Sequence, residues 1–240
     1  MTTSSVLRAT AADGVEVLRI DRPQVRNALD SATLDALLAE LDALAQDASL
    51  GALVLSTTDT QALCAGADLS EPLDHAGGVA RMEAFARLYA AVEAFPAATV
   101  CVCVGNVVGA GAEMAAGCDL RVGGDNLRLA WAGARVGAPI GPARLTPLIG
   151  MAAAKDLVLT ARTVGCDEAF ALGFLQRRAP AEEAEAVAIA LAAAIAAHPP
   201  EGVRALKQMF RSYEDLPARV ADENARIVAF QRDGAGLPRR

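Results

Sequence analysis

The sequence predicts an α/β fold with a largely parallel β-sheet, because short β-branched apolar runs alternate with segments of helical period. The composition agrees with this class: 53% of the residues are hydrophobic and 21% are charged, as in a well-packed globular protein with Ala-rich helices. A chain of 240 residues can form one large domain or a domain with a helical appendage, and either can bury a core.

Two elements are expected near the N-terminus. Residues 6–10 and 15–20 alternate in polarity around Asp13-Gly14, a pair suited to a tight turn, and this pattern predicts a β-hairpin. Asp30 or Ser31 then provides an N-cap for a helix with one buried face. The leucines that define this face are Leu34, Leu37, Leu38, Leu41 and Leu44.

The middle of the chain continues the alternation. Residues 53–56 predict a short buried strand, and residues 69–78 predict a mobile loop. A helix follows, with an apolar stripe of Met82, Phe85, Tyr89 and Val92, and it ends before Pro96. Further strands are expected at residues 100–104, 120–122 and 127–131.

A Gly/Pro cluster at residues 137–142 separates this part from a C-terminal part that is expected to be helical throughout. With the boundary near Ala161, residues 1–160 form the predicted core and residues 161–240 the C-terminal helical region. The expected helices cover residues 144–160, 166–172, 181–197, 201–212 and 217–231.

Charge and cysteine content exclude several functions. The formal net charge of −7 argues against binding to nucleic acids or anionic membranes, which requires a basic field. The five cysteines lack paired metal-ligand spacing and are interpreted as small apolar residues in a reducing cytosol. Residues 1–8 lack a signal-peptide pattern, and the apolar run 186–197 is too short to span a bilayer, so a cytoplasmic location is expected.

The motifs of cofactor and nucleophile chemistry are missing from the sequence. No phosphate-binding loop occurs, and Gly109-Ala110-Gly111 lacks the third glycine of a dinucleotide fingerprint. Neither His75 nor His198 has a Ser or Cys partner in a nucleophile motif, which makes a hydrolytic triad improbable. No residues show metal-ligand spacing, so chemistry without a metal or other cofactor is expected.

Two small-residue motifs, at residues 64–69 and 109–114, carry the chemistry that remains. Each follows an apolar run and predicts a strand that ends in a turn and starts a helix. Such turns present backbone N–H groups at a helix N-terminus, so the two together can form an oxyanion hole. Glu113 would then lie beside one of the two N–H donors. The alternative is a structural role, because the same small residues also allow close packing of a helix on a strand.

On several motifs together, the sequence resembles the enoyl-CoA hydratase/isomerase (crotonase) superfamily. The motifs occur in the family's order and near its spacing over residues 6–212. They are Asp21-Arg22-Pro23 with Arg26-Asn27-Ala28-Leu29, Leu63 to Leu69, Gly109 to Glu113 with Cys118-Asp119-Leu120-Arg121, and Leu148-Ile149-Gly150 with Ala169-Leu172-Gly173.

The resemblance implies a crotonase-like ββα spiral core with a C-terminal α-helical trimerisation region. It implies an acyl-CoA thioester substrate, of which coenzyme A is a part, and a homo-trimer or a hexamer built as a dimer of trimers. The family's oxyanion donors fall on Ala67 and Ala110, and its first catalytic glutamate falls on Glu113. Substrate and CoA contacts are expected at Arg26, Ala28, Ala65, Ala67, Asp68, Leu69, Gly109 and Gly133; from pattern alone Asp68 also reads as a cap or loop residue.

The second family glutamate, twenty residues after the first, is replaced by Gly133. Hydration with two glutamates divides water positioning and proton delivery between them, so one carboxylate should be a poorer catalyst. The predicted function is an enoyl-CoA hydratase/isomerase that uses Glu113 as acid/base. The alternatives are an acyl-CoA-binding protein with weakened catalysis, or another enolate reaction such as decarboxylation or thioester hydrolysis.

Overall fold

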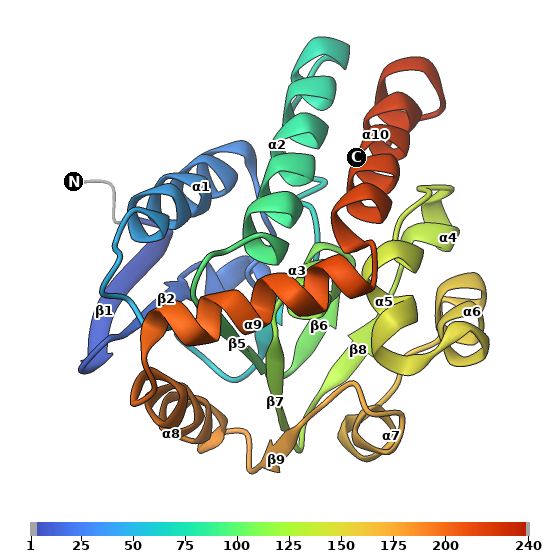
Figure 1. The fold of residues 1–240 in the computed structure, drawn as a ribbon. Helices are drawn as coiled ribbons and strands as arrows, with labels where there is room; N and C mark the ends of the chain where they lie inside the picture. Colours follow the sequence, from blue (N-terminus) through green and yellow to red (C-terminus); the bar gives the residue numbers. More distant parts are fainter. Residues whose placement is uncertain (1–3, 239–240) are drawn as a thin grey trace.

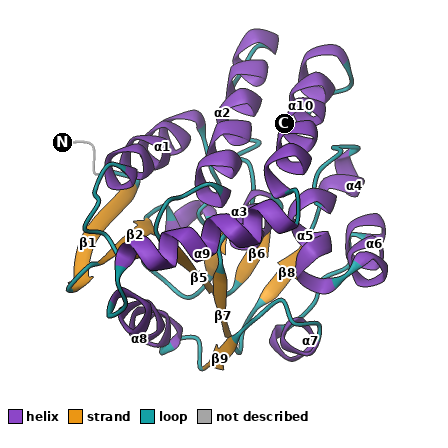
Figure 2. Cartoon of the chain, viewed as in Figure 1, coloured by secondary structure: helices purple, strands orange, loops and turns teal. Residues whose placement is uncertain are grey.

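The computed structural model describes residues 4–238 as two β-sheets with helices around them (Figure 1, Figure 2). The larger sheet has the order β1-β2-β3-β5-β7-β9, and all its neighbours are parallel except the β1–β2 hairpin. The smaller parallel sheet has the order β4-β6-β8. The strands are β1 Val6–Ala12, β2 Val15–Ile20, β3 Ala52–Thr57, β4 Ala62–Cys64, β5 Ala98–Cys103, β6 Asn106–Val108, β7 Leu120–Gly124, β8 Arg128–Ala130 and β9 Arg177–Ala179. The predicted α/β class with a largely parallel sheet is confirmed.

Both faces of the large sheet are covered, which explains its nearly continuous apolar strands. On one face Val54, Val100 and Val102 pack against the alanine stripe of α8. On the other, Leu53, Leu55 and both cysteines of β5 join the larger core with α1, α2 and α3. The helices are α1 Ser31–Ala45, α2 His75–Glu93, α3 Ala110–Gly117, α4 Gly133–Val136, α5 Pro142–Ile149, α6 Met151–Thr160, α7 Cys166–Ala171, α8 Ala184–Ala196, α9 Pro200–Tyr213 and α10 Leu216–Asp233, with a 3-10 turn at Pro23–Val25.

The C-terminal helix α10 folds back and runs beside α2 (Figure 1). This arrangement brings Ile227 and Leu237, far along the chain, to the same cavity as the α2 residues Phe85 and Tyr89. Within residues 4–238 no single helix is both long and apolar enough to cross a membrane; α8 and α9 reach that length only as a pair bent by 105°.

Four expectations are wrong in detail. The first small-residue motif starts no helix, because residues 65–74 form turns and irregular chain before α2 begins. The helix predicted over 144–160 breaks at Gly150, which has φ 80° and separates α5 from α6. The loop predicted to Gly78 ends earlier, because Asp74 caps α2 by accepting a 2.7 Å hydrogen bond from the Gly77 N–H. The C-terminal part is not wholly helical: residues 177–179 form β9, an edge strand of polar side chains that gives no apolar signal.

Candidate active site

The two small-residue motifs meet at one edge of the small sheet. Strands β4 and β6 are parallel neighbours, so the turns that follow them leave from the same edge. Gly66 and Gly109 both have positive φ (109° and 54°), and a Cβ added to Gly109 would lie 3.8 Å from the Gly66 Cα. A Cβ on Gly111 would lie only 2.4 Å from the Cys64 carbonyl oxygen, so α3 sits directly on the end of β4.

Two backbone N–H groups, those of Ala67 and Ala110, have no hydrogen-bond acceptor within residues 4–238. Leu29 bonds the residues on either side of Ala67: its N–H donates to the Gly66 carbonyl and its carbonyl accepts from the Asp68 N–H, both at 2.8 Å. Ala110 is the first residue of α3, where the helix supplies no acceptor. Within residues 4–238 neither amide donates a hydrogen bond, and both residues line one cavity. Paired donors with a helix N-terminus suit an oxyanion.

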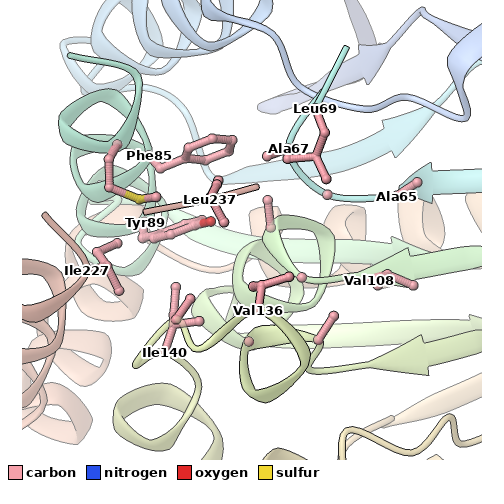
Figure 3. Close-up of a pocket in the computed structure, with 17 residues that line it drawn as sticks. Ala65, Ala67, Leu69, Phe85, Tyr89, Val108, Val136, Ile140, Ile227 and Leu237 are labelled. Atoms are coloured by element: carbon pink, nitrogen blue, oxygen red, sulfur yellow. The ribbon is translucent and has the colours of Figure 1, made fainter. Parts of the chain in front are cut away.

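The cavity has a volume of about 170 Å³ and apolar walls (Figure 3). Of the residues predicted to contact substrate, the structure places Ala65, Ala67, Leu69, Gly109 and Gly133 on its wall, together with Ala110. Side chains of α2 and the C-terminal segment, among them Phe85, Tyr89, Ile227 and Leu237, complete the wall and were not found from the sequence. The apolar stripe on α2 was the available signal for Phe85 and Tyr89.

Arg26, Ala28 and Asp68 do not line this cavity. Arg26 is exposed, and its carbonyl accepts a 3.0 Å hydrogen bond from the Ala65 N–H. Asp68 accepts hydrogen bonds from Ser70 at 2.6 Å and from Arg22 at 3.1 Å. Its side chain therefore holds the loop after the first motif, as the pattern-based interpretation of Asp68 expected.

Glu113 lies in a buried cluster that adjoins the cavity without lining it. Its side chain is 1% exposed, and Oε2 accepts a 3.1 Å hydrogen bond from Nη1 of Arg144 on α5. The same nitrogen donates to Oε1 of Glu223 on α10 at 2.8 Å, and Nη2 donates to Oδ1 of Asn224 at 3.0 Å. Glu113 Oε1 and Trp131 Nε1 are buried without a partner in the described part of the chain.

The cluster changes the acidity of Glu113. Burial and the neighbouring Glu223 carboxylate raise its pKa to about 8, against the opposing effect of Arg144. Burial also raises the pKa of Glu223, although the N–H groups of Ala143 and Gly141 favour its charged form. One arginine therefore serves two buried carboxyl groups, and Glu113 titrates in the range that suits a proton carrier.

The partners of Glu113 were missed by sequence reasoning. Arg144 follows Glu113 by 31 residues, and Glu223 follows Arg144 by 79. No local spacing links these three residues, because α5 contacts α3, and α10 contacts α5, only in the folded chain.

Gly133 is the first residue of α4 and lines the cavity. A Cβ there would lie 2.7 Å from the Ala138 carbonyl oxygen and 3.0 Å from Ile140 Cγ2. The 138–140 loop therefore leaves no room for a side chain at position 133.

Solved structures with this fold define the class as crotonase-type. An enoyl-CoA hydratase/isomerase from Xanthobacter autotrophicus Py2 superposes with a TM-score of 0.87 at 22% identity, over 99% of this chain and 90% of that one. DspI from Pseudomonas aeruginosa superposes with a TM-score of 0.82 at 25% identity, over 95% of this chain and 96% of that one.

The chain belongs to the enoyl-CoA hydratase/isomerase family, whose family model matches residues 10–232. The 2,3-dehydroadipyl-CoA hydratase of Escherichia coli is 31% identical over 214 residues, which cover 87% of this chain and 84% of that protein. A putative enoyl-CoA hydratase of Thermus thermophilus is 34% identical over 223 residues, with coverage of 90% and 87%. The resemblance to the crotonase superfamily is confirmed.

Proposed function

We propose that the protein binds a short-chain enoyl-CoA thioester and catalyses addition of water to its double bond or migration of that bond. The observation that carries this proposal is the pair of unbonded N–H groups of Ala67 and Ala110 on one cavity. The cavity volume of about 170 Å³ resembles that of an engineered apolar cavity of about 150 Å³ that admits benzene, which favours a short acyl group. A short-chain-enoyl-CoA hydratase of Clostridium acetobutylicum, 30% identical over 205 residues, also supports this choice.

In the proposed hydration, the ionised Glu113 takes a proton from water while the water oxygen bonds to carbon 3. The double-bond electrons move toward the thioester oxygen, where the Ala67 and Ala110 N–H groups stabilise the negative charge of the enolate. Glu113 then returns the proton to carbon 2, and the sum of the steps is the addition of one water. This scheme uses no metal or further cofactor, since coenzyme A arrives with the substrate.

A second candidate is an acyl-CoA-binding protein with little turnover. It is favoured by the position of Glu113, whose Oε2 is bonded to Arg144 behind the cavity wall, and by Gly133, which supplies no second carboxylate. Binding through the two amides would remain possible in that case.

The test combines turnover of crotonyl-CoA with calorimetric binding of butyryl-CoA. Ala110→Pro removes one amide donor at a helix N1 position, where proline is tolerated, and should lower kcat about 100- to 1,000-fold. His75→Pro, at N1 of α2 and outside the cavity, is the matched control and should retain activity. Binding without turnover by the unmodified protein would favour the second candidate. Unchanged activity of Ala110→Pro would refute the oxyanion role.

We also propose that the protein self-associates, as a trimer or a dimer of trimers, through α9. This helix exposes an apolar stripe in which each member lies three or four residues from at least one other: Leu206, Met209, Phe210 and Tyr213. Such a stripe is typical of an interaction surface.

A further inference from the structure

The cavity contains one polar side-chain group among the described residues that line it, the hydroxyl of Tyr89. All other lining residues are glycine or carry aliphatic, methionine or phenylalanine side chains. Figure 3 shows Tyr89 entering from α2 with its hydroxyl directed into the cavity. This hydroxyl bonds to no other residue in the range 4–238, and it is not among the buried polar atoms without a partner, so its oxygen is accessible from the cavity.

The ring that carries this hydroxyl is held in place on two sides. It stacks on Phe85 with ring centroids 5.9 Å apart, and the guanidinium carbon of Arg144 lies 5.2 Å from its centroid. Arg144 is itself fixed by Glu113 and Glu223. A polar group that is fixed in this way in an apolar pocket sets the orientation and the specificity of a ligand.

The hydroxyl is a donor over the neutral pH range. Burial, with the Glu113 carboxylate as a further cause, raises the pKa of Tyr89 well above its usual value. A ligand without a hydrogen-bond acceptor that displaces water from a protonated phenol leaves the hydroxyl without a hydrogen bond. In an apolar site this weakens the binding of that ligand. The cavity therefore penalises a plain alkyl chain at the position that the hydroxyl reaches.

We propose that Tyr89 is a specificity-determining residue whose hydroxyl donates a hydrogen bond to an oxygen on carbon 3 of the acyl group. The site would thus select a short 3-oxygenated acyl-CoA, with a hydroxyl or carbonyl at that carbon, over the unsubstituted acyl-CoA. This inference rests on the proposed function, because hydration of an enoyl-CoA places an oxygen on carbon 3 and the thioester oxygen must first be held by Ala67 and Ala110. Ala67, Ala110 and Tyr89 all line this one cavity of about 170 Å³.

The test compares the calorimetric affinity of acetoacetyl-CoA with that of butyryl-CoA, since neither thioester can lose water during the titration. The unmodified protein should prefer acetoacetyl-CoA, and Tyr89→Phe should reduce this preference about 3- to 10-fold, because it removes the hydrogen bond to acetoacetyl-CoA and relieves the unpaired hydroxyl that weakens butyryl-CoA binding. Tyr213→Phe is the matched control: Tyr213 lies on the apolar stripe of α9 and not on the cavity, and the substitution keeps its aromatic ring, so both affinities should be unchanged.

Each other outcome overturns a defined part of the reasoning. Equal affinity of the unmodified protein for the two thioesters, or a preference that persists in Tyr89→Phe, would refute the role of the hydroxyl and leave the thioester site intact. If the unmodified protein binds neither thioester, the proposed function fails and this inference fails with it. If the variant does not fold, equal affinity of the unmodified protein for the two thioesters still refutes the role of the hydroxyl.

Discussion

Substitution of Arg144 by methionine tests the buried cluster most directly. The change removes the cation that Glu113 and Glu223 share, and it leaves both carboxyl groups and Asn224 without their common partner. The side chain of Arg144 is 0% exposed, so water does not replace the lost contacts. Removing one member of a buried ion pair costs about 3–5 kcal/mol, and we expect Arg144→Met to lose that much free energy of unfolding.

This loss should grow with pH. Burial raises the folded-state pKa of Glu113 to about 8, from an ordinary value of 4.5. The stabilisation linked to this group is therefore complete below the unfolded pKa and disappears as the pH rises toward the folded pKa. Without Arg144 the pKa values of both carboxyl groups rise further, so the loss of free energy of unfolding in Arg144→Met should be larger at about pH 8.5 than at about pH 5.5.

Urea unfolding at the two pH values measures both effects. Arg162→Met is the matched control, because Arg162 also pairs with two acidic residues, Asp156 and Glu168, but its side chain is 38% exposed. Surface pairs of this kind contribute little to stability, because water screens the charges. An Arg144→Met protein no less stable than the Arg162→Met protein, or a deficit that is independent of pH, would refute the energetic role of the cluster.

Three further predictions concern single positions. Gly133→Ala should lower the free energy of unfolding in urea by about 1–3 kcal/mol, because the added methyl group would lie too close to the Ala138 carbonyl oxygen. Gly202→Ala is the control and should not lower this free energy, since the space around Gly202 is open. Phe210→Glu should shift the protein to a smaller species in light scattering, since Phe210 is 72% exposed on the apolar stripe of α9; an unchanged mass would place the interface elsewhere. If Glu113 is the base, kcat/KM for crotonyl-CoA should rise with pH to a plateau with a midpoint near pH 8, and Glu113→Gln should lose about 100- to 10,000-fold in rate while butyryl-CoA still binds. A flat pH profile would assign the proton to another group.

The elements that could be predicted are those whose cause is local. Asp13-Gly14 determines the first hairpin, and Asp30 caps α1 through a 2.9 Å hydrogen bond from the Thr33 N–H, as its residue type indicated. Strand β9 could not be predicted, because it is held by backbone pairing to β7 while Arg177 and Arg178 remain exposed. Its cause lies in a strand more than fifty residues away.

The same distinction applies to the site. Glycines that permit close approach are visible as small-residue motifs, so the turns bearing Ala67 and Ala110 were found, and their role as oxyanion donors stays a prediction. The environment of Glu113 was not visible, since it depends on Arg144 from α5 and Glu223 from α10. The sequence does not distinguish a buried arginine from an exposed one, because the burial results from the packing of the helices.

Arg144 connects two parts of the site, the buried cluster around Glu113 and the wall of the cavity. Its Nη1 donates to the Glu113 carboxylate, while its guanidinium carbon lies over the ring of Tyr89, one of the residues that line the cavity. Any ligand that displaces Tyr89 must therefore also disturb the cation that opposes the raised pKa of Glu113. In the proposed enzyme, the fit of the acyl group and the acidity of the proton carrier are thus linked through one side chain. An Arg144→Met protein that remains folded should change both the acetoacetyl-CoA preference and the pH midpoint of kcat/KM, and a change in only one of them would show that the two parts act independently.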